Sequence, residues 1–467
     1  MAIRKIKKRK HRKLERSLPV MRLNAAGIDI GATEIFVAVP ADRDGETVRS
    51  FPTFTEDLHL VADWLHHCRV DTVAMESTGV YWIPLFQILE ARGIEVHLVN
   101  AQHVHNVPGR KSDVLDCQWL QYLHSVGLLR ASFRPEQAVC EIRSLMRHRE
   151  SLVQMSCVHV QHMHKSLDQM NLQIHHVISD ITGVTGLAIV DAIVAGNTSP
   201  EELAKLRNHR IKASLETVTK SLVGDYRPEH IFTLEQSLKL YRYYQQLIGD
   251  CEHEVQQRIE SFETKTDGGS ASAADSSQSK AEGSASAADP SQSKTSNDSP
   301  FDLRRHLERI FGVDVTAIPG FDVLRTQTLF SELGADLSDF RTDSRFASWA
   351  NLCPKDGTSA GRRIRGPKIK SKNRVTQTFR MAAQSLHNNM SFLGDYYRRE
   401  RTRFGAIKAI KNAAHKLARI FFHVVTTRQP YDETVFAKLE ARHQNRRLRK
   451  LQNQAKQMGY SLMAIPA

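Results

Sequence analysis

The sequence has no uninterrupted apolar run of about 18 residues, the length that a helix needs to cross a lipid bilayer. The N-terminal stretch is basic, but the apolar segment that follows such a stretch in a secretory signal peptide is missing. The six cysteines are scattered without a C-x-x-C pair, which favours neither a disulfide framework nor a zinc site. We therefore expect a soluble, cytoplasmic protein with free and mostly buried thiols.

Apolar residues other than alanine are missing from residues 264–300. Within this tract, GSASAADSSQSK at 269–280 recurs as GSASAADPSQSK at 283–294. A tract of Ser, Ala, Gly and Asp has too little apolar surface to form a core, so we expect a flexible linker.

Acidic residues are fewer than basic ones. The chain has 65 Lys and Arg against 51 Asp and Glu, a net charge of +14, which suits a protein that meets a polyanion. Two basic blocks occupy residues 4–16 and 442–450. They predict disordered or helical arms for phosphate contacts, or alternatively tails that only increase solubility.

Short apolar runs alternate with a helical pattern in the first quarter of the chain. Residues 25–40 predict a strand, a glycine turn and a second strand, and residues 72–75 and 94–99 predict two further strands. Residues 80–92 have helical spacing. This alternation indicates an α/β sheet, in which ligands bind beyond the carboxyl ends of the strands.

Four acidic residues lie near these ends. Asp29 and Glu76 are at or near strand ends, and Asp113 and Asp116 lie on one face at the start of a helical pattern. A helical pair of this kind is also typical of a solvated face or an N-cap, but a carboxylate inside an apolar run is costly to bury unpaired. Converging carboxylates bind Mg²⁺, and two such ions would stabilise a phosphoryl displacement. The acids predict phosphodiester cleavage.

Two long helical patterns follow, at residues 142–174 and 231–262. Their apolar residues are spaced by three and four, which predicts a coiled-coil seam. Two antiparallel helices of one chain or a dimer would satisfy this seam equally well.

The second half of the chain carries hydroxyl groups among cations. Residues 357–362 predict a flexible loop, with further Lys and Arg up to residue 374. Alone, this segment is typical of generic phosphate binding, because a serine needs a base or a metal to become a nucleophile. Ile318-Pro319-Gly320 fits the hairpin of a helix-hairpin-helix element, although Pro and Gly mark any tight connection.

Several motifs together resemble a known family. GIDIG, MESTGVYW and GRKSDVLD resemble the RuvC-like DEDD domain of the bridge-RNA-guided insertion-sequence transposases, a family that includes Piv-type DNA invertases. TAIPGFDVLRTQTLFSELG, SWANLCPKDGTSAGRR and RMAAQSL, in the second half, resemble the serine-bearing domain of that family.

The resemblance implies an RNase-H-like N-terminal domain whose acids bind Mg²⁺, with Mn²⁺ as a substitute: Asp29, Glu76, Asp113 and Asp116. It also implies that Ser359 is the nucleophile that cuts and rejoins DNA through a phosphoserine. If the motif were aligned one residue earlier, the neighbouring Thr358 would take this place instead. The implied partners are double-stranded donor and target DNA, a guide or bridge RNA, and further copies in a dimer or tetramer, without a membrane. The implied location is the nucleoid of a bacterium.

These patterns divide the chain into six parts. They are a basic arm (1–20), a RuvC-like domain (21–135), coiled-coil helices (136–263), the linker (264–300), a mostly helical serine domain (301–430) and a basic C-terminal tail (431–467). We expect the linker to let the serine domain reach the acids of another protomer.

Three alternatives need weighing, of which the first two stay open. A RuvC-like metal-dependent nuclease would need the acids without the serine. A non-catalytic nucleic-acid-binding protein would not need four acids in register. GIDIGATEI also resembles the first phosphate loop of sugar kinases and actin-like ATPases, but the second Asp-Gly-rich loop of those proteins is missing from the sequence.

Overall fold

The computed structural model describes residues 18–77, 79–100, 113–262, 302–353, 357–359, 362–364 and 373–461. The chain divides into two compact units, Met1–Arg134 and Pro135–Ala467. Most of the predicted basic arm and the whole predicted linker lie outside the described residues.

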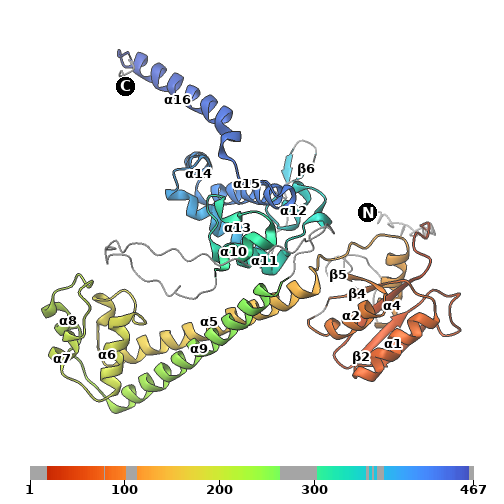
Figure 1. The fold of residues 1–467 in the computed structure, drawn as a ribbon, viewed down its shortest axis with the longest axis horizontal. Coiled ribbons are helices and arrows are strands. Elements are labelled where there is room, and N and C mark those ends of the chain that lie inside the picture. Colours follow the sequence, from red (N-terminus) through yellow and green to blue (C-terminus); the bar gives the residue numbers. More distant parts are fainter. Residues whose placement is uncertain are drawn as a thin grey trace, which may run out of the picture. The chain divides into compact units, whose positions relative to one another are not determined.

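The N-terminal unit is built around a five-stranded mixed sheet in the order β3-β2-β1-β4-β5 (Figure 1). β2 pairs antiparallel with β1 and β3, whereas β4 pairs parallel with β1 and β5. The strands are β1 (Ala25–Ile30), β2 (Glu34–Ala38), β3 (Val48–Pro52), β4 (Thr72–Glu76) and β5 (Glu95–Val99). This sheet is consistent with an RNase-H-like N-terminal domain.

Helices cover both faces of the sheet. α1 (Thr55–His67) and α2 (Trp82–Ala91) share a core with Ile28, Ile30 and Met75. α4 (Asp113–Ser125) packs on β1, β2 and β4. Because alternate residues of a strand face opposite sides, the even-numbered residues of β1 face α1 and α2, and the odd-numbered residues face α4.

The structure confirms the strands predicted within 25–40, 72–75 and 94–99 and the helix predicted within 80–92. The sequence patterns did not reveal β3 and α1. β3 is an edge strand in which Ser50 and Pro52 are exposed, so it lacks the regular apolar alternation of a half-buried strand.

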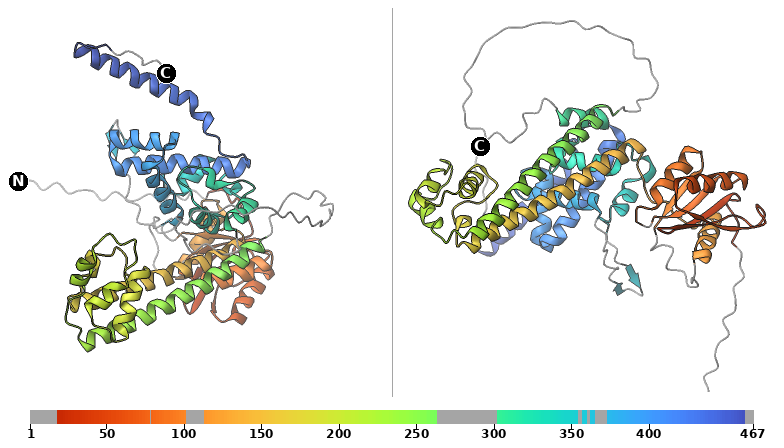
Figure 2. Two further views of the ribbon diagram at one scale, coloured as in Figure 1. Left: turned by 60° about the vertical axis from the view of Figure 1, so that its left-hand side comes forward. Right: turned by 90° about the horizontal axis from the view of Figure 1, so that it is seen from below.

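Two helices of 33 residues form the long arm of the second unit, α5 (Gln137–Gln169) and α9 (Pro228–Glu260). They lie side by side in every view (Figure 1, Figure 2). The residue numbers of the contacting pairs rise along α5 and fall along α9, so the helices are antiparallel. The pairs are Arg149 with Glu252, Ser156 with Gln245, and Ser166 with Thr233. Of the two arrangements that satisfy the seam, the chain uses the antiparallel pair within one protomer.

The far end of this arm carries a small helical bundle that the sequence analysis did not predict. Its helices are η1 (Ile174–His176), α6 (Val184–Val194), α7 (Pro200–Lys205) and α8 (Leu215–Ser221). Ile189, Leu203 and Val218 are fully buried there together with Leu234 of α9. The bundle therefore closes the loop between the two long helices with an apolar core of its own.

The rest of the second unit is mostly helical. Phe346, Phe379 and Phe421 form its centre, with ring centroids 5.6 to 6.0 Å apart. The elements are α10 (Leu303–Phe311), η2 (Val315–Ala317), α11 (Val323–Leu333), η3 (Ser338–Phe340), α12 (Asp343–Trp349), β6 (Gly357–Ser359), β7 (Arg362–Ile364), α13 (Arg374–Ser385), η4 (Leu386–Asn388), α14 (Phe392–Phe404), α15 (Ala406–Thr427), η5 (Glu433–Phe436) and α16 (Ala437–Gln457).

The residues on either side of the predicted linker belong to the same unit. The Arg309 guanidinium on α10 donates to the carbonyl oxygens of Ile259 and Phe262, at 3.1 and 2.9 Å, where α9 ends. The Phe262 ring lies 5.2 Å from the Phe330 ring. The residues on either side of the predicted linker are thus packed together within the second unit. The division between the two compact units falls at residues 134 and 135. The role of residues 264–300 as a linker that lets the serine domain reach another protomer stays a prediction.

Within the described residues, no helix has the length and apolar character that crossing a membrane requires. The six cysteines all lie within the described residues and, as predicted, form no disulfide. Their predicted burial holds for half of them: Cys68, Cys117 and Cys251 are buried, Cys140 and Cys353 are partly exposed, and Cys157 is exposed.

Candidate active site

Asp29 and Glu76 lie on neighbouring parallel strands at the same level of the sheet. β1 pairs with β4 in a register that places Ile28 beside Met75. One residue further, this register brings Asp29 beside Glu76, on the same face of the sheet. Glu76 is the last residue of β4, and Asp29 is the last but one of β1. The two predicted acids are therefore brought together at the carboxyl ends of their strands.

Gly27 allows α4 to lie directly on this face. A Cβ atom at residue 27 would come within 2.2 Å of the Gln121 nitrogen and 2.3 Å of the Cys117 carbonyl oxygen. Gly27 and Asp29 are two residues apart on one strand and therefore share a face. α4 thus crosses the face that carries Asp29 and Glu76.

Two of the predicted acids affect the pKa of the Cys117 thiol. Cys117 is fully buried, and burial is the main reason that its pKa rises to about 12, with the charges of Asp29 and Asp116 adding to the rise. The chain geometry agrees with these causes. Asp116 precedes Cys117 in α4, and Gly27, two residues before Asp29 on the same face of β1, lies against the Cys117 backbone.

Three of the four predicted acids are thus placed at one face of the sheet. Asp113 begins α4, three residues before Asp116, but its side chain lies outside the described residues. In the described part of the chain, no three Asp, Glu, His or Cys side chains come close enough together to hold a metal ion. The donors are nevertheless carboxylate oxygens, which are the ligands that Mg²⁺ and Mn²⁺ prefer. The donor set therefore fits a hard divalent cation.

His124 fixes the other end of α4, and no sequence pattern predicted it. It is fully buried, and its two ring nitrogens lie 2.9 Å from Thr72 Oγ1 and 2.9 Å from the Arg22 guanidinium. Because a guanidinium can only donate, Nδ1 accepts from Arg22 and Nε2–H donates to Thr72. Burial, followed by the charges of His97 and Arg22, lowers the pKa of His124 to about 3. A neutral imidazole therefore joins α4 to the start of β4.

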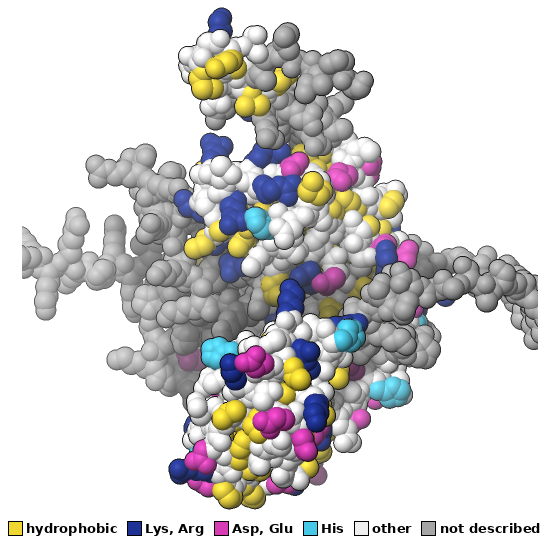
Figure 3. Space-filling model, turned by 90° about the vertical axis from the view of Figure 1, so that its left-hand side faces the viewer, with side chains coloured by type: hydrophobic (Ala, Val, Ile, Leu, Met, Phe, Trp, Pro, Cys, Tyr) yellow, Lys and Arg dark blue, Asp and Glu magenta, His cyan; other side chains and the backbone are white. Residues whose placement is uncertain are grey.

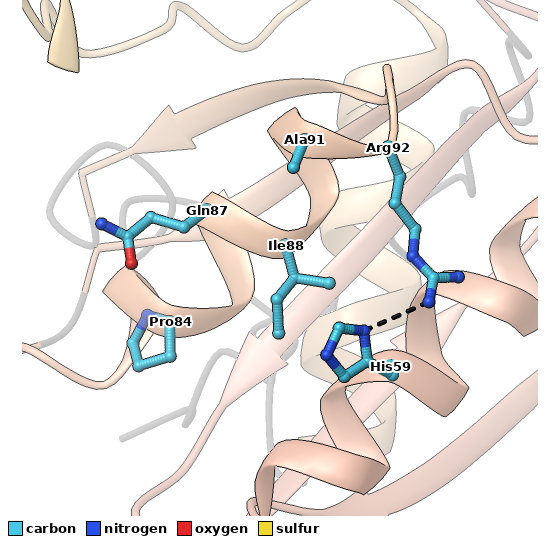
Figure 4. Close-up of a pocket in the computed structure, with 6 residues that line it drawn as sticks. All are labelled: His59, Pro84, Gln87, Ile88, Ala91 and Arg92. Carbon is cyan, nitrogen blue, oxygen red and sulfur yellow. Dashed lines mark hydrogen bonds between the residues drawn. The ribbon is translucent and has the colours of Figure 1, made fainter.

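A surface pocket of the N-terminal unit lies away from the acids. It is lined by residues of α1 and of α2 with its C-cap: His59, Pro84, Gln87, Ile88, Ala91 and Arg92 (Figure 4). The Arg92 guanidinium lies 3.1 Å from His59 Nδ1 at its rim. Since α1 and α2 cover the face opposite to α4, this pocket is not part of the candidate site.

Ser359 is the last residue of a hairpin strand. β6 pairs antiparallel with β7, with Thr358 opposite Arg363 and Ser359 opposite Arg362. The prediction of a flexible loop is wrong for these strand residues, because paired backbone groups fix their conformation. Successive strand positions belong to opposite faces, so Thr358 and Ser359 occupy different faces of the hairpin. Their side chains lie outside the described residues.

Contacts join described segments that precede and follow the hairpin in the chain. Thr376 Oγ1 in the first turn of α13 donates to the Ala350 carbonyl oxygen after α12, at 2.5 Å. Arg374, the first residue of α13, pairs with Glu150 at 2.5 Å and with Glu332 at 3.6 Å. In the sequence, Arg374 was only one of several cations. Its partners are far away along the chain, so no local pattern could reveal them.

Glu332 is at the centre of this cluster. Its side chain is only 10% exposed and accepts two hydrogen bonds from Arg147, at 3.0 and 2.7 Å. Arg143 donates to the Glu332 carbonyl oxygen at 2.7 Å, in the last turn of α11. A buried carboxylate is stable only with such partners. The cluster therefore joins α5, α11 and α13 within the unit that carries the hairpin.

The predicted hairpin at Ile318-Pro319-Gly320 is a tight turn between η2 and α11. Gly320 has a φ of +96°, and a Cβ atom there would lie 2.6 Å from the Ala382 carbonyl oxygen of α13. The turn thus packs closely on α13, which follows the serine hairpin in the chain. Its role in binding phosphate stays a prediction.

Two family models match the chain over these regions. Residues 26–172 match the DEDD transposase domain of the IS110 family, and residues 314–398 match the transposase domain of the IS116/IS110/IS902 family. The chain carries two transposase domains. The first match includes the sheet, α4 and the four acids, and the second includes Ser359. No curated protein matches the chain.

These domains give the chain the signature of an insertion-sequence transposase, an enzyme that acts on DNA. The DEDD domain suggests that the transposase depends on a divalent metal. Residues 173–313 and 399–467 lie outside both matches. They include the bundle at the end of the arm and helices α15 and α16.

Proposed function

We propose that the transposase cuts and rejoins DNA strands through a covalent phosphoserine formed by Ser359. The observation that carries this proposal is the arrangement of Asp29, Glu76 and Asp116 at one face of the sheet, in a chain that also carries the second transposase domain. Acids alone would suit hydrolysis, whereas the second domain supplies a serine hydroxyl.

In the proposed reaction, Ser359 Oγ attacks the scissile phosphorus and forms an O–P bond. The bond from phosphorus to one deoxyribose oxygen breaks, and that oxygen leaves with a proton as a free hydroxyl. The serine proton passes to a base. In the rejoining step, a deoxyribose hydroxyl attacks the phosphoserine and releases Ser359, so no outside energy source is needed.

The four acids would hold Mg²⁺, or Mn²⁺ in its place, with Asp113 completing the set. The metal would supply Lewis-acid stabilisation of the attacking and leaving oxygens. Gly27 and His124 contribute by fixing α4 on the sheet, so that Asp116 stays near Asp29. The sequence resemblance alone supports guidance by a bridge RNA and an oligomer in which the acids of one protomer meet the serine domain of another.

The decisive experiment concerns Ser359. Wild-type protein on a nicked suicide substrate should leave a DNA-linked peptide that contains this residue, whereas Ser359→Ala should bind DNA yet form no adduct. Thr358→Val is the matched control, and we expect it to retain the adduct. Cleavage by Ser359→Ala without an adduct in either protein would identify a hydrolytic nuclease instead. An adduct mapped outside residues 357–361 would refute the assignment.

The acids need a separate test. Asp29→Asn and Asp116→Asn should abolish strand cleavage with the fold intact, because an amide is a much weaker ligand for Mg²⁺ than a carboxylate. Asp57→Asn on α1, on the opposite side of the sheet, is the control. EDTA should remove activity and Mn²⁺ should restore it. Unchanged recombination in Asp29→Asn or Asp116→Asn would refute the assignment of the metal site. If the wild-type protein bound DNA but never cleaved it, a non-catalytic binding protein would be favoured.

A further inference from the structure

The corner between α14 and α15 exposes a compact group of cations. All eight residues from 401 to 408 are exposed, as is Lys411 in the second turn of α15. Four of these residues are basic: Arg401, Arg403, Lys408 and Lys411. Gly405, with a φ of 81°, separates the two helices, so the last turn of α14 lies next to the first turns of α15. Figure 3 shows Lys and Arg side chains gathered over the C-terminal helices.

Few carboxylates balance these charges. Glu400 is the one acidic residue between positions 396 and 411. Arg401 donates to His387 at 2.9 Å, and the ion pair nearest in the chain joins Arg398 to Asp395. Within the described residues, none of the four exposed cations forms an ion pair. Like charges held together are unfavourable without a counter-charge, so the corner suits a polyanion.

Two apolar side chains lie among the cations. Phe404 is 41% exposed and Ile407 is 77% exposed. The Arg403 guanidinium lies 4.7 Å from the centre of the Phe404 ring. A nucleic acid offers matching groups for both kinds of side chain, because its phosphates attract cations and its bases and sugars contact apolar and aromatic groups. Charge alone would also suit an acidic protein, but the exposed ring favours a nucleic acid.

We propose that this corner binds the phosphate backbone of a nucleic acid through Arg401, Arg403, Lys408 and Lys411. The proposal rests on the proposed function, since a transposase must hold DNA, and it adds a contact surface beyond both matched domains. α14 begins within the second matched domain and ends at the corner. A nucleic-acid strand bound at this corner is therefore held by the same compact unit that carries Ser359.

The test compares two double variants of the full-length protein. Arg403→Gln/Lys411→Gln should weaken binding to duplex DNA and reduce the slope of log K against log salt by about 1.8, because each phosphate contact contributes about 0.9. Arg210→Gln/Lys212→Gln removes the same two charges from exposed positions between α7 and α8. We expect this control pair to keep the wild-type slope.

A structured RNA of similar length provides a second arm of the experiment. A reduced slope with only DNA or only RNA supports the proposal and identifies the nucleic acid that the corner holds. Unchanged slopes with both overturn it, as does an equal reduction in the control pair, which would reflect net charge alone. Failure of the phosphoserine mechanism is scored separately, by the adduct assay on Ser359→Ala, and leaves these slopes unaffected.

Discussion

Gly27 is a residue at which the backbone of α4 lies directly against the sheet. We predict that Gly27→Ala destabilises the N-terminal unit by about 1–3 kcal/mol and removes strand cleavage, since α4 must move and carry Asp116 with it. Urea unfolding and a cleavage assay measure the two effects. Gly45→Ala is the control, because a Cβ atom there would meet no atom within 4 Å. Equal behaviour of the two variants would contradict the close approach of α4.

His124 predicts how the stability of this unit depends on pH. The pKa of His124 in the folded state, about 3, lies below its ordinary value of 6.5. The unfolded chain therefore binds a proton that the folded chain does not, over the window between these values. The stabilising contribution of His124 is complete above about pH 6.5 and is lost as the pH falls towards 3.

Hydrogen exchange of α4 peptides between pH 7 and 4, corrected for the intrinsic exchange rate, should show increasing local opening as the pH falls. His124→Gln should be less stable at pH 7, because it loses the fitted imidazole, but should show a flatter pH dependence. The Arg22 guanidinium and the His97 ring face His124, and both remain in this variant. The same pH dependence in His124→Gln would assign the effect to other groups.

At the scale of secondary-structure elements, Glu332 holds α5, α11 and α13 together through its arginine partners. We predict that Glu332→Ala destabilises the second unit by about 3 kcal/mol, because it leaves partly buried arginines without their shared carboxylate. Glu216→Ala is the control. It removes an exposed partner of Lys220, a pair 2.9 Å apart, and should cost less than about 1 kcal/mol.

Thermal unfolding followed by circular dichroism measures both glutamate variants. The cluster also fixes the start of α13, so Glu332→Ala at a temperature where it is folded should still bind DNA but yield less serine adduct. A stability equal to that of the control would show that the cluster contributes no more than a surface ion pair.

The two long helices, α5 and α9, show which features a sequence pattern can predict and which it cannot. Apolar spacing was enough to predict both long helices, because each buries a continuous stripe over 33 residues. It could not decide between a pair within one chain and a dimer, since both bury the same stripe. The antiparallel choice follows from the bundle at 174–221, whose short helices lack a long repeating pattern and bring the chain back on itself.

At the scale of the whole molecule, the contacts beside residues 264–300 predict that this tract is dispensable. Replacing it with a flexible Gly/Ser segment of about ten residues, whose ends adapt to a range of separations, should leave the melting temperature and recombination unchanged. The reason is that Phe262 and Arg309 already join α9 to α10 without it. Recombination on a plasmid pair and thermal unfolding measure the outcome.

Arg309→Gln within the full chain is the matched comparison for the shortened tract. It should lower the melting temperature, because the carbonyl groups at the end of α9 lose their donor. Loss of recombination in the shortened protein with an unchanged melting temperature would instead support the predicted linker role, in which the tract lets the serine domain reach another protomer.

The sequence by itself determined the local features of this protein. The strands of the sheet centre, the long helices, the acids at strand ends and the hydroxyl segment depend on neighbours within a few residues, and their spacing carries that information. Only the tertiary structure decided which acids share a face. The register of β1 and β4 places Asp29 beside Glu76, and the missing side chain of Gly27 lets α4, the helix of Asp116, lie on the same face. The partners of His124 and Glu332 are likewise distant in the chain, so burial and hydrogen bonding arise there only once the units have folded.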